Sequence, residues 1–335
     1  MAAAGFDGEL RQGKRRIMAS IACRRPRLRH ALKGFLMSQT VTIGNGKLAA
    51  TIDSMGAQLT SLALDGREYL WQADGRWWAK HAPVLFPIVG RLRNNHAESA
   101  AGPCNMQQHG VARISEHRLV SVSGDGSSAT FELTDTSATR DAYPYAFKLG
   151  MTYAITGPAT LSQTFTVTNT GNVDLPFSVG GHPAFNVPAP GGAEAGERFE
   201  DYELRFAEPW TAVCPKIVEG GLADPEDTFT PLADGSVLPL TRSCFDYDTM
   251  VFSHVPSNTV ELVGTKSGRG VRVDFPDFDF LGVWSAAPDA PFVALEPWTG
   301  HATLTTEDDV LEHKENITIL APGAIDTRTF TMTLL

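Results

Sequence analysis

The sequence predicts an all-β protein with the architecture of a large antiparallel β-sandwich, on three observations. From Thr40 onward, short runs rich in Val, Ile, Thr and Phe are divided by Gly, Asp-Gly and Asn-Gly turn signals. Apolar and polar residues alternate along several of these runs, as they do in half-buried strands. After residue 37, no window repeats apolar residues at helical spacing through three turns. Closely spaced strands without helices between them favour a sandwich or a barrel.

The first expected element is a hairpin. Residues 41–43 and 48–52 are strand-like and flank Asn45-Gly46, a favoured hairpin turn because both residues tolerate a positive φ. Further strands are expected at 161–168 and 271–275, where the residues alternate in polarity. Other turn signals divide the remaining strand-like segments and occur at Asp65-Gly66, Asp74-Gly75, Gly124-Asp125-Gly126, Gly171-Asn172, Asp234-Gly235 and Gly268-Arg269-Gly270.

The charge distribution sets an N-terminal arm apart from the rest of the chain. Residues 1–37 contain nine Lys or Arg and two acidic residues, a net charge of +7, whereas the whole chain of 335 residues carries −10, which leaves −17 for residues 38–335. We interpret the arm as an extension from a start codon upstream of Met37; a targeting segment and a functional basic tail are the alternatives. Residues 38–335 show no repeat or linker and are expected to form one catalytic domain.

The overall composition excludes several classes of function. A hydrophobic content of 42% and a charged content of 20% are typical of a soluble globular protein. No run of eighteen apolar residues is present to cross a membrane, and the negative net charge opposes binding to nucleic acid. The four cysteines lie far apart without a C-x-x-C pair, which favours a reducing, cytoplasmic compartment.

Signatures of common cofactor sites are also missing. The sequence contains no phosphate-binding G-x-x-x-x-G-K-[ST], no G-x-G-x-x-G between a strand and a helix, and no H-E-x-x-H. The glycine-rich residues 264–270 lie between two strand-like runs and are interpreted as a hairpin tip. The nine histidines are dispersed and lack metal-ligand spacing, so we expect neither a metal nor a cofactor.

Two ionisable residues stand at the ends of strand-like runs, each directly before a proline. His182 lies in Gly180-Gly181-His182-Pro183, and Glu296 lies in Leu295-Glu296-Pro297-Trp298. Proline holds the preceding residue extended, so both backbones should be stiff. A His and a Glu that face one cleft would form an acid/base pair. Taken singly, a structural His and a surface Glu are the favoured interpretations of these two residues.

Arginines, tryptophans and an aspartate complete the set of candidates. Buried arginines need an anion or several acceptors, which sugar hydroxyls, a phosphate or a carboxylate would supply. For Arg93 we favour a structural ion pair instead. Trp284 and Trp298 offer flat apolar faces suited to stacking on a sugar ring, although core packing is the commoner use. The remaining candidates are Arg91, His109, Arg113 and Asp248.

At these residues the sequence resembles the aldose 1-epimerase (galactose mutarotase) family, particularly its LacX-like branch. The resemblance covers about residues 40–335 and rests on motifs in the family's order: Phe86-Pro87 to Arg93, His109-Gly110, Gly181-His182-Pro183-Ala184-Phe185, Asp248, and Glu296-Pro297-Trp298-Thr299-Gly300. It implies a galactose mutarotase-like supersandwich that interconverts the α and β anomers of an aldose without a metal or cofactor. His109 is followed by Gly110-Val111-Ala112-Arg113, as in the LacX-like branch and unlike the galactose-acting members.

The resemblance also implies roles for individual residues. Glu296 resembles the general base that takes the proton from the anomeric hydroxyl, and His182 the acid that protonates the ring oxygen. His109 and Asp248 resemble residues that bind the sugar, and Arg91 the substrate-binding arginine. A neutral-pH working state with a carboxylate and a protonated His would need a raised His pKa, which Asp248 could supply, and predicts a bell-shaped pH dependence.

Three alternatives stay open on the sequence alone. A hexose-6-phosphate mutarotase would use Arg91, Arg93 or Arg113 to bind the phosphate. A non-catalytic carbohydrate-binding β-sandwich would use the same arginines and tryptophans without proton transfer. A glycoside hydrolase would use the carboxylates of Asp248 and Glu296. The expected partner is a monosaccharide, with a monomer and a homodimer both open.

Overall fold

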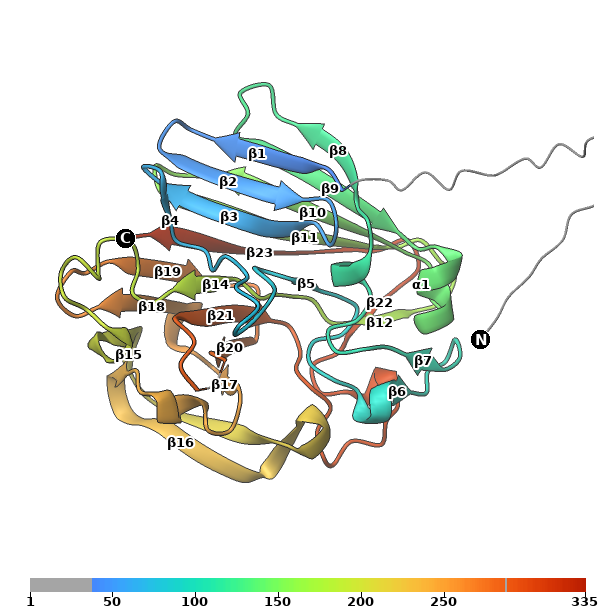
Figure 1. Cartoon of the computed structure of the whole chain (residues 1–335). Helices are drawn as coiled ribbons and strands as arrows, with labels where there is room; N and C mark the ends of the chain where they lie inside the picture. Colours follow the sequence, from blue (N-terminus) through green and yellow to red (C-terminus); the bar gives the residue numbers. More distant parts are fainter. Residues whose placement is uncertain (1–37, 287) are drawn as a thin grey trace, which may run out of the picture. The chain divides into compact units, whose positions relative to one another are not determined.

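The computed structural model describes residues 38–286 and 288–335, which consist mainly of antiparallel strands (Figure 1). The predicted all-β architecture is thereby confirmed. The expected arm at residues 1–37 lies outside the described residues.

The largest sheet contains nine strands and includes two of the predicted ones, 161–168 within β11 and 271–275 largely within β19. Its strands, in spatial order, are β16 (Leu222–Pro239), β15 (Tyr202–Val218), β18 (Thr259–Gly264), β19 (Gly270–Asp274), β23 (Ile325–Leu334), β11 (Thr160–Asn169), β10 (Phe147–Ile155), β9 (Ser128–Thr134) and β8 (Arg118–Val122). The glycine-rich residues 264–270 connect β18 to β19 and are the predicted hairpin tip.

One turn prediction is wrong. Asp234-Gly235 lies inside β16 rather than between two strands, at a point where the pairing with β15 shifts register. Asp234 has a φ of 48°, so the Asp-Gly pair forms a bulge instead of a turn. Asp-Gly supplies positive φ in either setting, and the sequence alone does not distinguish them.

A six-stranded sheet packs against the large one and supports the candidate site. Its strands are β17 (Met250–Ser253), β20 (Phe280–Trp284), β21 (Phe292–Trp298), β13 (Gly180–Gly181) and β5 (Val84–Leu85), with β14 (Ala184–Asn186) also paired to β21. A Cβ on Gly181 would lie 2.6 Å from the ring of Phe330 in β23, so the two sheets are in close contact at β13. A larger residue at this position would push the sheets apart.

A four-stranded sheet lies across the β9–β11 part of the large sheet (Figure 1). It begins with the predicted hairpin around Asn45-Gly46 and consists of β1 (Thr40–Gly44), β2 (Leu48–Asp53), β3 (Gln58–Leu64) and β4 (Arg67–Glu68). The hydroxyl of Tyr153 on β10 donates to the carbonyl of Ala57 at 2.7 Å and ties the two sheets together. Buried tyrosines need such a partner for their hydroxyl.

The remaining elements are short. Two-stranded sheets are formed by β12 (Leu175–Phe177) with β22 (Thr318–Leu320), and by β6 (His96–Ala97) with β7 (Cys104–Asn105). The helices are α1 (Ser137–Ala142) and the 3-10 turns η1 (Arg93–Asn95), η2 (Ala112–Ile114), η3 (Phe199–Asp201), η4 (Glu219–Gly221), η5 (Arg242–Phe245), η6 (Pro256–Asn258) and η7 (Leu311–His313). Within the described residues, no helix has the length and apolar character needed to span a membrane.

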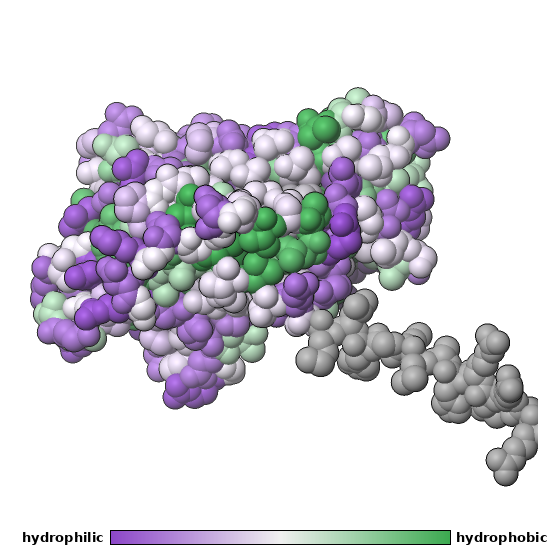
Figure 2. Space-filling model, turned by 90° about the horizontal axis from the view of Figure 1, so that it is seen from above, coloured by the Kyte–Doolittle hydropathy of each residue, from purple (hydrophilic) through white to green (hydrophobic). Residues whose placement is uncertain are grey.

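The face shown in Figure 2 carries mostly hydrophilic residues, with apolar ones gathered near its centre. Such a mixture is ordinary for a folded protein, because polar groups are too few to cover the whole surface. The site therefore has to be located from a cavity and its chemistry rather than from surface hydropathy.

Candidate active site

A cavity of about 330 Å³ opens beside the six-stranded sheet. A volume of this order suits a small ligand such as a monosaccharide. The cavity wall is formed by side chains of β20 and β21, by the loops that follow β5 and β7, and by the end of the β15–β16 hairpin. All seven candidates from the sequence line it: Arg91, His109, Arg113, His182, Asp248, Glu296 and Trp298.

Glu296 lies on β21, a strand with neighbours on both sides, and its side chain is 1% exposed. Gly282 on β20 is its cross-strand partner, and a Cβ there would collide with the ring of Trp298. Burial raises the pKa of Glu296 well above its usual range, and the negative charge of Asp248 adds to the effect. Burial therefore favours the protonated form of this carboxyl group.

His182 lies between β13 and β14, next to Gly181, which packs against β23. Its Nε2 is 3.2 Å from Oε2 of Glu296, but the two atoms are not aligned for a hydrogen bond. Burial lowers the pKa of His182 to about 3; a backbone hydrogen bond opposes this shift, and the charge of Arg113 adds to it. The imidazole and the carboxyl group are thus in direct reach of each other and of a ligand in the cavity.

The predicted electrostatics of this pair are wrong in direction. We expected Asp248 to raise the pKa of His182, whereas burial lowers that pKa. Asp248 is exposed at the cavity mouth and acts on the pKa of Glu296 instead. The free-energy cost of removing water from an imidazolium outweighs its attraction to a solvent-exposed carboxylate.

His109 is fixed by two hydrogen bonds with the backbone of Gly90. The His109 N–H donates to the Gly90 carbonyl at 2.8 Å, and the Gly90 N–H donates to His109 Nδ1 at 3.1 Å. Because Nδ1 accepts, the neutral ring carries its proton on Nε2 and can donate to a ligand oxygen. Burial lowers the pKa of His109 well below its usual value, and the charges of His182, Arg113, Arg91 and Lys80 lower it further.

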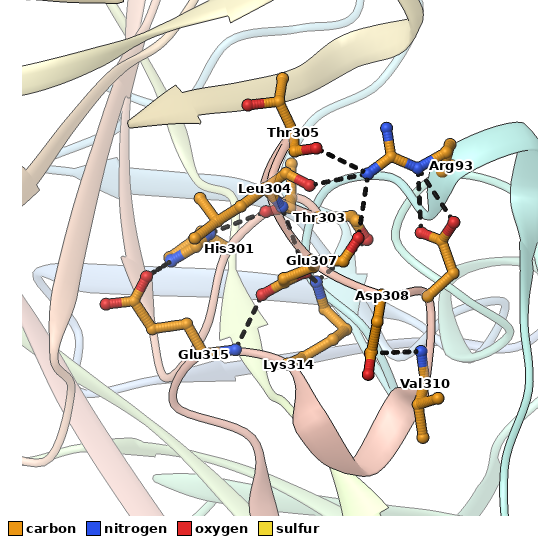
Figure 3. Close-up of polar contacts among 12 residues, drawn as sticks. Arg93, His301, Thr303, Leu304, Thr305, Glu307, Asp308, Val310, Lys314 and Glu315 are labelled. Atoms are coloured by element: carbon orange, nitrogen blue, oxygen red, sulfur yellow. Dashed lines mark hydrogen bonds and ion pairs between the residues drawn. The ribbon is translucent and has the colours of Figure 1, made fainter. Parts of the chain in front are cut away.

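The arginines fall into two groups. Arg93 pairs with Asp309 at 2.9 Å and also donates to the carbonyls of Leu304, Thr305 and Glu307 (Figure 3), so the predicted structural ion pair is confirmed. Arg91 and Arg113 line the cavity, and no carboxylate in the described part of the chain pairs with either of them.

The Nε atom of Arg113 is buried and has no hydrogen-bond partner among the described residues. Burial lowers the pKa of Arg113, and the charge of Arg91 adds to this effect. Burial likewise lowers the pKa of the nearby Lys80, and the charge of Arg113 contributes. The positive charges of Arg91, Arg113 and Lys80 therefore lie close enough to repel one another.

Trp78 and His301 also line the cavity and were not predicted. Trp78 stacks on the ring of His182, with ring centroids 4.8 Å apart, and His301 donates from Nδ1 to the carbonyl of Ala302 at 2.7 Å. His301 Nε2 lies 3.3 Å from Glu315 (Figure 3). His301 follows the Glu296–Gly300 motif by one position, which could have drawn attention to it, whereas no signal in the sequence links Trp78 to the site.

The described residues contain no group of three His, Cys, Asp or Glu side chains arranged to hold a metal ion. The side chains that line the cavity include two that can exchange protons, His182 and Glu296. His109 and Asp248 can form hydrogen bonds there, and the arginines supply positive charge.

Comparisons with known proteins agree with this chemistry. A model of the family "Aldose 1-epimerase" matches residues 39–318. The plasmid and chromosomal LacX proteins of Lactococcus lactis subsp. lactis are 37% and 36% identical to the chain over 304 residues, which is 88% of this chain and 99% of each relative.

Solved structures give the same result for the fold. A galactose mutarotase related enzyme from Lactobacillus acidophilus is 31% identical, with a TM-score of 0.81 over 89% of this chain and 97% of that protein. A galactose mutarotase-like protein from Lactobacillus casei is 30% identical, with a TM-score of 0.80 over 89% of this chain and 100% of that protein. The resemblance and the fold predicted from the sequence are confirmed.

Proposed function

Because the chain belongs to the aldose 1-epimerase family of isomerases, we propose that Glu296 and His182 interconvert the α and β anomers of a monosaccharide by opening and reclosing its ring. In this proposal Glu296 takes the proton from the anomeric hydroxyl, and His182 gives a proton to the ring oxygen. Rotation about C1–C2 then presents the other face of the carbonyl for reclosure. No covalent intermediate with the protein is needed.

The observation that carries the proposal is the 3.2 Å separation of His182 Nε2 and Glu296 Oε2 in the wall of the cavity. The two sugar oxygens that exchange protons are bonded to the same carbon, so the acid and the base must lie close together. A Glu and a His that can each reach one of these oxygens meet that requirement.

The protonation preferences of the pair also support the proposal. With a closed sugar bound, the reacting state is the carboxylate of Glu296 and the imidazolium of His182. Ring opening moves one proton onto Glu296 and one off His182, so both groups become neutral. Burial favours the neutral form of both groups, as their pKa shifts show. The buried site therefore favours the protonation state that accompanies the open-chain sugar.

Three further residues contribute binding in this proposal. His109 Nε2–H and the carboxylate of Asp248 hold sugar hydroxyls, as a donor and an acceptor respectively. Trp298 supplies an apolar ring at the cavity wall, where it can pack on the less polar face of a sugar.

Polarimetry on freshly dissolved glucose and galactose tests the assignment. Glu296→Gln and His182→Asn should each slow anomer exchange by about 10²–10⁴-fold, the usual contribution of a general acid or base. Glu208→Gln, at an exposed position away from the cavity, should exchange anomers at the unaltered rate. Sugar binding without accelerated exchange in the unmodified protein would instead identify a carbohydrate-binding module.

A second candidate, an aldose 1-epimerase that prefers an anionic sugar such as a hexose 6-phosphate, is favoured by one observation. Arg91 and Arg113 face the cavity without a paired carboxylate in the described chain, and Lys80 adds to their charge. Charged donors without an anion are costly to bury, and a bound phosphate would offset this cost by pairing with their positive charge.

This candidate predicts a difference between substrates. Arg113→Gln should raise KM for galactose 6-phosphate by about 10–100-fold, the value of a charged hydrogen bond, and change KM for galactose much less. Arg140→Gln, which removes an exposed ion pair with Asp135, serves as the control. Equal effects of Arg113→Gln on both sugars would exclude a phosphate site at Arg113.

The same proposal extends to the organisation and location of the chain. Every residue that lines the cavity lies between positions 78 and 302, which supports residues 38–335 as the catalytic unit. Cys104, Cys214 and Cys244 are free thiols, which fits a cytoplasmic location. The polarimetric assay on a chain that begins at Met37 tests the first point, and cell fractionation tests the second.

A further inference from the structure

The imidazole of His182 lacks the hydrogen bond that usually orients a catalytic histidine. Its Nδ1 is buried, and in the described chain no residue other than His182 itself donates to it or accepts from it. In most proton-transferring histidines, an acceptor on the second ring nitrogen fixes the ring plane and the tautomer. Another interaction must therefore hold the ring of His182 in place.

Aromatic rings surround His182 instead. The ring of Trp78 stacks on it with centroids 4.8 Å apart and planes 21° apart. The rings of Trp284 and His109 meet it edge-on, at centroid distances of 5.8 Å and 5.7 Å. Of these three rings, Trp78 alone covers a face of the imidazole, so its contact defines the plane of the ring.

Trp78 is itself held firmly. The backbone N–H of Trp78 donates to the carbonyl of Asp74 at 3.1 Å, and its backbone carbonyl accepts from the indole N–H of Trp71 at 2.9 Å. Its ring also packs against Trp284 and Phe292, which lie on β20 and β21. The stacking surface is thus fixed to the same strands that carry the cavity wall.

We propose that Trp78 is a positioning residue for the epimerase reaction: it sets the ring plane of His182 toward Glu296 and stabilises the imidazolium form through the face of its indole. A cation over an indole face is attracted by the ring quadrupole. This inference rests on the proposed function. Trp78 contacts the proposed acid, His182, and does not contact the atoms of the sugar that react.

Other charged groups act on His182 as well and have to be kept constant in a test. Glu296 from β21 lies 3.2 Å away and favours the imidazolium, whereas Arg113 and the neighbouring His109 disfavour it. Substitutions at Trp78 leave all three in place. A change in pH dependence in such a variant therefore reports the loss of the stack.

The test uses Trp78→Leu, which removes the aromatic face, and Trp78→Phe, which restores a weaker one. Trp78→Leu should lower kcat for anomer exchange by about tenfold with little change in KM. It should also move the acidic limb of the pH–rate profile down by about half a pH unit, because the pKa of His182 lies below that of Glu296 and the acidic limb therefore reports the imidazolium. Trp78→Phe should fall between this variant and the unmodified protein in both measurements. Trp77→Leu, a change in the adjacent indole that packs on Trp71 rather than on His182, should leave the limb unmoved.

The outcomes separate the inference from the function on which it rests. An unmodified protein that does not accelerate exchange contradicts the proposed function. An active unmodified protein whose kcat and pH limbs stay unchanged in Trp78→Leu contradicts only the role of Trp78. A fall in kcat with unmoved limbs would make Trp78 a structural residue and overturn the inference. If Trp78→Leu does not fold, Trp78→Phe decides the question. A limb shifted from its position in the unmodified protein supports the inference, and an unshifted limb overturns it.

Discussion

The two proposed proton-transfer residues, Glu296 and His182, are buried at a cost to stability. Glu296 is 1% exposed and lies in the middle of a sheet, where a carboxylate has almost no water around it. Its Oε2 has no hydrogen-bond partner among the described residues. A buried acid of this kind stays protonated or destabilises the fold when it ionises.

The first prediction concerns the stability of Glu296→Gln. The folded-state pKa of Glu296 is raised, so its favourable contribution is complete below the unfolded pKa near 4.5 and is lost as pH rises toward the folded pKa. The Gln amide in this variant cannot ionise, so the variant does not lose stability in this way as pH rises. We expect Glu296→Gln to have a higher Tm than the unmodified protein at pH 8, by at least about 2–4 °C, the shift that ~1 kcal/mol gives in a protein of this size.

Thermal unfolding at pH 5 and pH 8 measures the effect. The Tm difference between Glu296→Gln and the unmodified protein should grow from the lower pH to the higher one. Glu208→Gln, at an exposed position, should show no such growth. A constant difference at both pH values would mean that Glu296 is ionised in the fold throughout this range.

At the scale of elements, the cavity depends on a close contact between two loops. Gly90, in the loop after β5, has a φ of 70° and exchanges two hydrogen bonds with His109. A Cβ on Gly90 would lie 2.6 Å from Cα of Ala302, in the segment that follows β21. The absence of a side chain at Gly90 therefore allows both loops to reach the cavity wall.

The second prediction compares Gly90→Ala with Gly66→Ala. Gly66 has a φ of 74° in the β3–β4 turn and nothing within 4 Å of its missing Cβ. Gly66→Ala should lower the free energy of unfolding by about 1–2 kcal/mol, the cost of a left-handed alanine. Gly90→Ala carries the same cost plus a backbone collision, for which we expect about 1–3 kcal/mol more.

Chemical denaturation measures both variants, and polarimetry adds a second readout. Gly90→Ala should also raise KM, because His109 moves with Gly90, whereas Gly66→Ala should keep the normal KM. Equal losses of stability in the two variants would show that the loop accommodates the methyl group without displacing Ala302.

The elements also show what could be predicted from the sequence. The hairpin at Asn45-Gly46 and strands such as β11 depend on local turn chemistry and alternation, which a short window contains. His182 and Glu296 were identified because each directly precedes a proline, although Glu296 lies within β21 and not at the strand end that the sequence predicted. Asp234-Gly235 was misassigned, since a bulge and a turn use the same dipeptide.

Contacts between distant segments could not be predicted. Arg93 was expected to form an ion pair, but its partner Asp309 lies 216 positions away. Trp78 and His182 are brought together only by packing of the loop after β4 against β20 and β21. The pKa directions of His182 and Glu296 likewise depend on burial, which composition does not reveal.

For the whole molecule, burial of histidines limits stability in acid. His109, His117 and His182 are all buried, and burial lowers the pKa of each, to about 4 for His117 and about 3 for His182. A lowered folded-state pKa means that stability is complete above the unfolded value near 6.5 and is lost as pH falls toward the folded value. The unfolded chain takes up these protons first, so acid favours unfolding.

The third prediction is a fall in Tm as pH decreases from about 6.5 to 4, with each of these histidines contributing up to about 1.4 kcal/mol per pH unit. His117 offers the cleanest test because it is not among the residues that line the cavity, and its Nδ1 bonds to the carbonyl of Ser115 at 3.0 Å. In His117→Asn the amide can donate to the same carbonyl but does not titrate, so the Tm of this variant should fall less steeply with decreasing pH. His254→Asn, at an exposed residue whose φ of 58° suits Asn, should retain the full slope. Identical slopes in all three proteins would place the acid sensitivity in the carboxylates instead.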